Sequence, residues 1–240
     1  MTKAKYGLDA PKVTRNLFLF GIFSGVLSAL AFLAISNRAI ALVLGIIFAF
    51  TGFCLLITGL LMVFSSSVGK LKEREKILDA LNLYGNEEIL DVGCGRGLYL
   101  IGAAKRLMKG GHATGIDIWQ NDDLSNNSQQ NTLNNALYEG VSERVRVETA
   151  DMRKIPYENE SFDVVLSCLA IHNIYEEIER EKALLEIIRV LKSGGALCII
   201  DLSHVREYIE ISEANGISIK KTKRLNLVFP KSIAVIGTKE

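Results

Sequence analysis

The sequence predicts a doubly wound α/β domain, with a mostly parallel sheet of seven strands and an antiparallel hairpin at one edge, preceded by two transmembrane helices. Three observations lead to this prediction. Two long apolar segments lie near the N-terminus, short apolar strands alternate with helices from residue 87 onward, and the last two strands follow each other without an intervening helix. Such alternation is typical of a parallel sheet covered on both faces.

The two apolar segments are long enough to cross a membrane. Residues 17–35 and 39–64 carry no charged side chain, and a helix crosses the ~30 Å hydrocarbon core in about 20 residues. A signal peptide is the alternative, but its apolar core is only about 7 to 15 residues long. A second segment also follows directly after residues 36–38. We therefore predict a transmembrane hairpin at residues 17–64.

Flanking charge predicts the orientation of this hairpin. Lysine and arginine precede the first segment and follow the second, whereas the connecting loop carries only Arg38. Positive charge favours the cytoplasmic side, so both ends are expected in the cytoplasm of a cell with the hairpin in its cell membrane. We expect a cytoplasmic tail at 1–16, a linker and leading helix at 65–86, and the α/β domain at 87–240.

Small residues recur on one face of each apolar segment and would allow close helix packing in lipid. They are Gly21, Gly25 and Ser28 in the first segment, and Ala41, Gly45, Ala49, Gly52 and Gly59 in the second. We interpret these stripes as the contact between the two spans. A homodimer through a spare stripe is the alternative.

Charge and cysteine usage exclude some classes of function. The net charge is +1, so no nucleic-acid partner is expected. The four cysteines are not spaced as CxxC, and no histidine stands near them at metal-ligand intervals. We therefore expect free thiols, with neither disulfides nor a metal site.

The elements of the α/β domain follow from short apolar runs and their flanking residues. Strands are expected at 87–92, 112–118, 144–149, 162–168 and 196–202, and helices at 70–83, 97–109, 125–139, 176–192 and 205–215. Gly110, Gly140, Gly194 and Gly216 fall just past helix ends, where a left-handed residue is common. The last two strands, 217–227 and 232–240, must pair as an antiparallel hairpin.

The segment "ILDVGCGRG" at 89–97 combines a strand end, a glycine turn and a helix start, which together form a ligand site in parallel sheets. Gly93, Gly95 and Gly97 are expected to let a ligand approach the backbone. A dinucleotide fingerprint would place glycine at position 98, where this chain has leucine. The carboxylate of Asp91 disfavours a pyrophosphate and favours a cationic amine. S-adenosylmethionine carries such an amine.

The next two strand ends carry further ligand-suited residues. Asp117, followed by Ile118 in "GIDIW", can accept both hydroxyls of a ribose. Asp151, followed by Met152 in "TADM", can accept from the exocyclic amine of adenine. Asp117 alone does not separate S-adenosylmethionine from NAD, and each carboxylate alone could cap a strand end.

The end of the fourth strand, "SCLAIHN", should border the reacting group because this strand neighbours the first. We expect Ser167 to reach the cofactor. His172 is a candidate general base near neutral pH. The alternative is that it lines the pocket or caps the next helix.

Over about residues 70–240 the chain resembles the class I S-adenosylmethionine-dependent methyltransferases. The matching segments are "ILDVGCGRG", "GIDIW", "TADMRKIPYENESFDVVLSCLAIHNI" and "LLEIIRVLKSGGALCIID", in the order and spacing of that family. The resemblance is nearest to the small-molecule branch that includes ubiquinone and menaquinone C-methyltransferases. It implies a Rossmann-like sheet with a reversed last strand and S-adenosyl-L-methionine as cofactor.

Together these features predict a membrane-anchored methyltransferase that acts on a small or lipid-soluble acceptor. The hairpin suggests the lipid-like acceptor, because it would hold the domain at the bilayer. One alternative is a membrane-tethered protein that binds S-adenosylmethionine without turnover. The other is an NAD-dependent oxidoreductase, which would require glycine at position 98 and a catalytic Tyr/Lys pair; neither is evident in the sequence.

Overall fold

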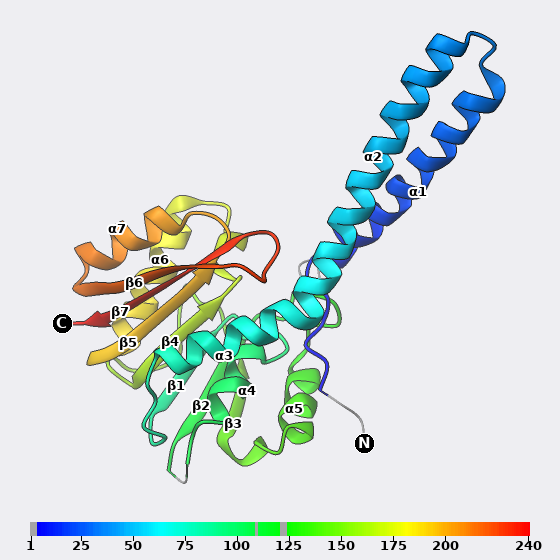
Figure 1. Cartoon of the computed structure of the whole chain (residues 1–240). Helices are drawn as coiled ribbons and strands as arrows, with labels where there is room; N and C mark the ends of the chain where they lie inside the picture. The colour runs from blue at the N-terminus through cyan, green and yellow to red at the C-terminus, as the bar shows by residue number, and fades with distance from the viewer. Residues whose placement is uncertain (1–3, 109, 121–123) are drawn as a thin grey trace.

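The computed structural model describes residues 4–108, 110–120 and 124–240, and Figure 1 shows a helical hairpin that projects from an α/β domain. The hairpin consists of α1 (Pro11–Ala34) and α2 (Arg38–Phe64). Both helices are long and apolar enough to cross a membrane. The structure therefore has two candidate spans where the sequence predicted them, with α1 beginning six residues earlier than expected.

The small residues of the hairpin pack the two helices against each other. The hydroxyl of Ser28 donates a 2.7 Å hydrogen bond to the Gly45 carbonyl. A Cβ added at Gly52 would lie 2.9 Å from the carbonyl oxygen of Gly21, so the backbones touch there. Gly25 instead has open space around it. The contact between the spans thus uses most of the predicted stripe.

The second span does not end in a flexible linker. It continues through a π-helical turn (Ser65–Gly69) into α3 (Lys70–Ala80), and Arg38–Ala80 is one continuous helix. The sequence predicted a linker from residue 65, where three serines follow one another. Two of them are buried against the domain instead: the hydroxyl of Ser65 accepts a 2.8 Å hydrogen bond from the Phe229 amide, and Ser66 bonds to Asp9.

The α/β domain contains a seven-stranded sheet in the order β3-β2-β1-β4-β5-β7-β6. Neighbours among β1 to β5 pair in parallel, whereas β7 pairs antiparallel with β5 and β6 antiparallel with β7. This arrangement confirms the predicted sheet and its edge hairpin. The strands are β1 (Glu88–Val92), β2 (His112–Asp117), β3 (Val145–Thr149), β4 (Phe162–Cys168), β5 (Leu191–Asp201), β6 (Ile217–Leu225) and β7 (Ser232–Lys239).

Helices cover both faces of the sheet, as the alternation of strands and helices predicted. One buried cluster joins α3 and two further helices to one face, and a second cluster joins the remaining two helices to the other. Successive strand residues alternate between the clusters: Ile89 belongs to the first and Leu90 to the second. The helices are α4 (Leu98–Ala104) and α5 (Gln129–Tyr138) on the first face, and α6 (Glu177–Val190) and α7 (Val205–Ala214) on the second.

Two boundaries differ clearly from the prediction. Helix α4 ends at Ala104, five residues before its predicted end, so Gly110 does not directly follow it. The fifth strand begins at Leu191, directly after the last residue of α6, and not at residue 196. Gly194, at φ 79°, therefore lies inside β5 and does not cap a helix. Gly140 and Gly216, at φ 71° and 82°, follow the ends of α5 and α7 as predicted.

The chain before α1 packs on the domain. We call residues 4–10 the N-terminal strap. The Lys5 amide donates to Asn135 Oδ1 on α5 and the Lys5 carbonyl accepts from Asn135 Nδ2, both at 2.9 Å. Tyr6 is buried, and its hydroxyl donates to Glu139 at 3.3 Å. The N-terminal strap is thus held against α5 before the chain enters the hairpin.

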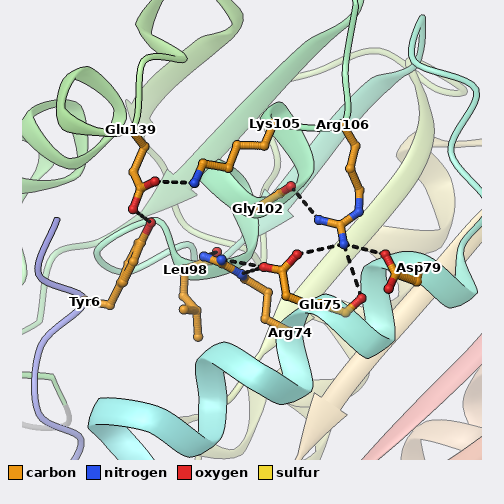
Figure 2. Close-up of polar contacts among 9 residues, drawn as sticks. All are labelled: Tyr6, Arg74, Glu75, Asp79, Leu98, Gly102, Lys105, Arg106 and Glu139. Atoms are coloured by element: carbon orange, nitrogen blue, oxygen red, sulfur yellow. Dashed lines mark hydrogen bonds and ion pairs between the residues drawn. The ribbon is translucent and has the colours of Figure 1, made fainter. Parts of the chain in front are cut away.

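A polar network joins α3, the continuation of α2, to the region of α4, as Figure 2 shows. Arg106 Nη2, after α4, lies 2.8 Å from Glu75 and 2.5 Å from Asp79 on α3. Arg74 donates to Glu75 at 2.7 Å and to the Leu98 carbonyl at 3.3 Å. Leu98 is the first residue of α4. The helix that leaves the hairpin therefore contacts the helix that follows the glycine turn.

Candidate functional site

The glycine turn lies between β1 and α4, where the sequence predicted it. Gly93, Gly95 and Gly97 have φ of 72°, 52° and 81°, a region that side-chain-bearing residues rarely adopt. An added Cβ would lie 2.3 Å from Ala170 Cβ at Gly93 and 2.9 Å from Ile101 Cδ1 at Gly97. Backbone conformation and protein packing therefore already require these glycines. The predicted reason, approach of a ligand, is not needed to explain them.

Asp91 lies beneath this turn with 1% of its surface exposed. Its Oδ2 accepts a 2.8 Å hydrogen bond from the Leu100 amide in the first turn of α4. Burial raises the pKa of Asp91 to about 7; the Leu100 hydrogen bond opposes this rise and the charge of Asp117 adds to it. A cation placed beside Asp91 would favour its ionised form, because the two charges attract in a region of low polarity.

Asp117, at the end of β2, fixes the glycine turn from the other side. Its Oδ2 accepts a 2.8 Å hydrogen bond from the Gly95 amide. Its Oδ1 accepts from the Trp119 amide at 2.6 Å and from Asn127 Nδ2 at 3.2 Å. Asp117 thus has the structural role that the sequence analysis kept as an alternative, and its neighbour Ile118 is 49% exposed.

Asp151, after β3, is paired with an arginine that the sequence analysis missed. Arg153 Nε lies 3.0 Å from Oδ1, and Arg153 Nη2 lies 2.5 Å from Oδ2. These hydrogen bonds lower the pKa of Asp151. Arg153 also contacts Glu179 at 3.2 Å. The carboxylate expected to accept from adenine is therefore already ion-paired, and a ligand there would have to share Asp151 with Arg153.

His172 lies in a 3₁₀ turn (Ile171–Asn173) after β4 and contacts Asp201 at the end of β5. The His172 amide donates to Asp201 Oδ2 at 3.1 Å. Its Nδ1 lies 2.6 Å from Asp201 Oδ1, off the direction required for a hydrogen bond. Sequence reasoning missed Asp201, although its place at the carboxyl end of a parallel strand was a usable signal.

Two predicted site residues do not line the cavity that contains the others. Ser167 is 2% exposed, and its hydroxyl donates a 3.0 Å hydrogen bond to the Val92 carbonyl, so it ties β4 to β1. Gly97 precedes the first residue of α4 and packs against Ile101 and Thr132. Both positions are therefore structural supports of the turn, not part of the surface open to a ligand.

The other predicted residues surround one cavity of about 1020 Å³ at the carboxyl ends of the strands. They are Asp91, Gly93, Gly95, Asp117, Ile118, Asp151, Met152 and His172. Parallel sheets bind ligands at this edge, and the cavity is at the upper end of ordinary ligand pockets, which span ~300–1000 Å³. The cavity also extends to the hairpin, where Val13, Leu17, Thr58 and Met62 line it. No sequence pattern indicated this extension.

Residues 90–199 match the protein family described as a methyltransferase domain. A sterol 4-C-methyltransferase of Caenorhabditis elegans, strm-1, is 32% identical over 132 residues, which are 55% of this chain and 36% of that protein. A demethylmenaquinone methyltransferase of Lactiplantibacillus plantarum is 28% identical over 130 residues, 54% of this chain and 51% of the relative. The matches thus span about half of this chain and between about a third and a half of these relatives.

Solved structures share the fold of the domain. A SAM-dependent methyltransferase from Aquifex aeolicus is 24% identical, with a TM-score of 0.56 over 74% of this chain and 95% of that one. The geranyl diphosphate C-methyltransferase from Streptomyces coelicolor A3(2), solved with geranyl diphosphate and S-adenosyl-L-homocysteine, is 16% identical with a TM-score of 0.57. That alignment covers 70% of this chain and 78% of the other.

Proposed function

We propose that the α/β domain is an S-adenosylmethionine-dependent methyltransferase, which transfers the methyl group of this cofactor to a small or lipid-soluble acceptor at a membrane. One observation carries the proposal. A single cavity joins the carboxylates of Asp91, Asp117 and Asp151 to His172. A methyltransferase needs this arrangement, because cofactor and acceptor must meet away from water with their reacting atoms aligned.

The residues present fit S-adenosylmethionine, which supplies a methyl group activated on a sulfonium. Asp91 is buried with a pKa of about 7 and lines the cavity, so an ammonium group there would stabilise its carboxylate. We assign the ribose hydroxyls to Asp117 and the adenine edge to Asp151 and Met152. Both carboxylates keep at least partial access, since Asp117 and Asp151 also line the cavity.

His172 is the candidate catalytic residue of the acceptor end. It lines the cavity, and its side chain is 18% exposed. Its Nδ1 faces the buried Asp201, which leaves Nε2 for proton exchange with an acceptor. We propose that His172 takes the proton that an oxygen, nitrogen or carbon acceptor loses during transfer. An acceptor without such a proton would need His172 only as part of the pocket wall.

The hairpin supports the membrane part of the proposal. Its outer surface is apolar: Leu19, Phe20, Phe50 and Phe53 are each 57–68% exposed. Basic residues flank the hairpin on the domain side, which favours a cytoplasmic domain and a cell-membrane location. A homodimer through the spans would have to use exposed positions such as Gly25, because most small residues pack within the hairpin.

Cofactor binding is the first test. Isothermal titration of the purified full chain should show binding of S-adenosylmethionine and S-adenosylhomocysteine. Asp117→Ala should weaken binding by about 1–3 kcal/mol, because hydrogen bonds to a charged group are lost. Asp163→Ala, whose carboxylate pairs with Lys192 and does not line the cavity, is the matched control. NAD binding of comparable strength would contradict the proposal.

Turnover is the second test. The protein in native membranes is incubated with methyl-labelled S-adenosylmethionine, and the labelled product is isolated. A labelled small molecule or lipid supports the proposed transfer. Tight cofactor binding without any labelled product would indicate the alternative, a cofactor-binding protein without turnover.

A further inference from the structure

We propose that the cavity opens sideways into the bilayer and that the hairpin is one wall of the acceptor site, so that the acceptor is an amphiphile with an apolar chain. This inference rests on the proposed methyl transfer and specifies its substrate class. It assigns to the membrane helices a role in substrate binding beyond anchoring.

The hairpin contributes side chains to the same cavity that contains His172. Val13 and Leu17 come from the beginning of α1, and Thr58 and Met62 from the end of α2. These positions lie at the domain end of the hairpin, where α1 and α2 approach the sheet (Figure 1). A pure anchor would need no contact with the reaction cavity, so this shared wall requires another explanation.

The loop between β6 and β7 supplies another part of the wall. Val228, Phe229 and Pro230 line the cavity, and Val228 is 7% exposed. The Phe229 amide bonds to Ser65 in the π-helical turn, and Gly69 packs against the Leu227 carbonyl. The loop is thus fixed to the hairpin, and together they form a largely apolar end of the cavity.

The charged groups at this end do not require a charged ligand. Lys70 lines the cavity with 7% of its surface exposed. Its ammonium lies 2.9 Å from Asp9 and donates to the carbonyls of Tyr6 and Gly7 at 3.4 and 3.3 Å. These three acceptors match the three N–H groups of an ammonium. The apolar side chains therefore determine what binds here, and an alkyl or isoprenoid-like chain fits them.

The position of Val13 connects the cavity with the lipid-facing surface. Val13 lines the cavity and is also 52% exposed, and the exposed Leu19 and Phe20 follow on the same helix. In a membrane this region of α1 borders the acyl chains or the headgroup boundary. An apolar chain can therefore pass from the bilayer into the cavity without crossing water, while its polar head reaches the His172 end.

Filling the opening tests this inference. Val13→Trp narrows the cavity end, and Val43→Trp is the matched control, because Val43 is 57% exposed on α2 but does not line the cavity. Both variants are reconstituted in liposomes made from native membrane lipids. Label transfer from methyl-labelled S-adenosylmethionine to organic-extractable product should fall about tenfold or more for Val13→Trp only, since pocket contacts discriminate by such factors. Binding of S-adenosylhomocysteine should match wild type in both variants.

A photolabel gives a measurement that does not depend on turnover. An aryl diazirine dissolved in the bilayer should label the peptide containing residues 225–230 in the wild type. The extent of labelling of this peptide should be lower in Val13→Trp. Absence of this labelling would overturn the inference, as would equal transfer by the two variants or a product confined to the aqueous phase. If the wild type itself bound no cofactor or transferred no methyl label, that result would instead contradict the proposed function.

Discussion

His172 Nδ1 lies 2.6 Å from Oδ1 of Asp201, a carboxylate that is 1% exposed at the end of β5. The same carboxylate accepts from the His172 amide at 3.1 Å and from the Tyr208 hydroxyl at 3.3 Å. Asp201 therefore fixes the backbone turn through a hydrogen bond, and its charge faces Nδ1 of the His172 ring without a hydrogen bond. A histidine held in this way has a defined face toward the cavity, which a base requires.

Substitution of His172 separates a catalytic from a structural role. His172→Ala should reduce the chemical step about 10²–10⁴-fold while leaving cofactor affinity near wild type. His204→Ala is the control, because His204 is 40% exposed and does not line the cavity. Equal activity of the two variants, measured with the identified acceptor, would assign His172 to the pocket wall. Abolished cofactor binding in folded His172→Ala would contradict its placement beside the acceptor.

Asp201 is expected to act through His172 as a positioning residue. Asp201→Asn keeps the shape of the side chain but removes the charge beside the ring. It should lower kcat more than it raises KM, because the His172 ring loses the negative charge that lies 2.6 Å from its Nδ1. A folded Asp201→Asn variant with the kcat of the wild type would show that Asp201 is only a structural support.

Asp91 should make the stability of the folded protein depend on pH, and this dependence can be measured without an acceptor. Its pKa is about 7 in the folded protein and ~3.9 in an unfolded chain, so the folded state holds the proton more tightly. The stability that this group contributes is full below about pH 4 and is lost as the pH rises through about 7. Asp91→Asn cannot ionise, so its Tm relative to wild type should be higher at pH 8 than at pH 5.

The control for this prediction is a carboxylate outside the cavity. Asp163→Asn removes the partner of Lys192, and its Tm difference from wild type should not grow between pH 5 and pH 8. A Tm difference for Asp91→Asn that is the same at both pH values would show that the Asp91 carboxyl does not titrate in this range.

The elements that the sequence predicted well depend on local patterns. The apolar run before the glycine turn at Gly93 becomes β1, and the uncharged segments become α1 and α2. The edge hairpin was also predictable, because two strands without an intervening helix can only pair antiparallel. These signals need no knowledge of which residues meet across the fold.

Features that depend on contacts between distant segments were not predictable. The contact of Asp201 with His172 joins residues 29 positions apart, and the sequence does not indicate which of its many carboxylates lies beside this histidine. Ser167 has a hydroxyl suited to a ligand, yet a backbone carbonyl on the neighbouring strand takes its hydrogen bond. The cavity wall formed by α1 and α2 could not be predicted without knowing how the hairpin lies against the sheet. The π-helical turn sets that position.

The proposed topology is tested by labelling single cysteines with a membrane-impermeant reagent in intact cells. Ser36→Cys, in the loop between the spans, should react from outside, since positive charge places both ends in the cytoplasm. Lys72→Cys should react only after permeabilisation. Lys72 is exposed, whereas Lys70 is buried and would be unreactive on either side. A Cys54→Ala background removes the exposed cysteine of α2. Outside labelling at position 72 would reverse the orientation.

The attachment of the hairpin to the domain depends on Gly69. A Cβ at this position would lie 1.8 Å from the Leu227 carbonyl oxygen, so Gly69→Ala must displace either α2 or the loop between β6 and β7. Overpacking of this kind costs about 1–3 kcal/mol. Thermal unfolding in detergent should therefore show a lower Tm for Gly69→Ala. Gly25→Ala, at a helical glycine with open space around it, should remain near wild type. Equal Tm values for the two variants would show that the hairpin is not held to the domain by this contact.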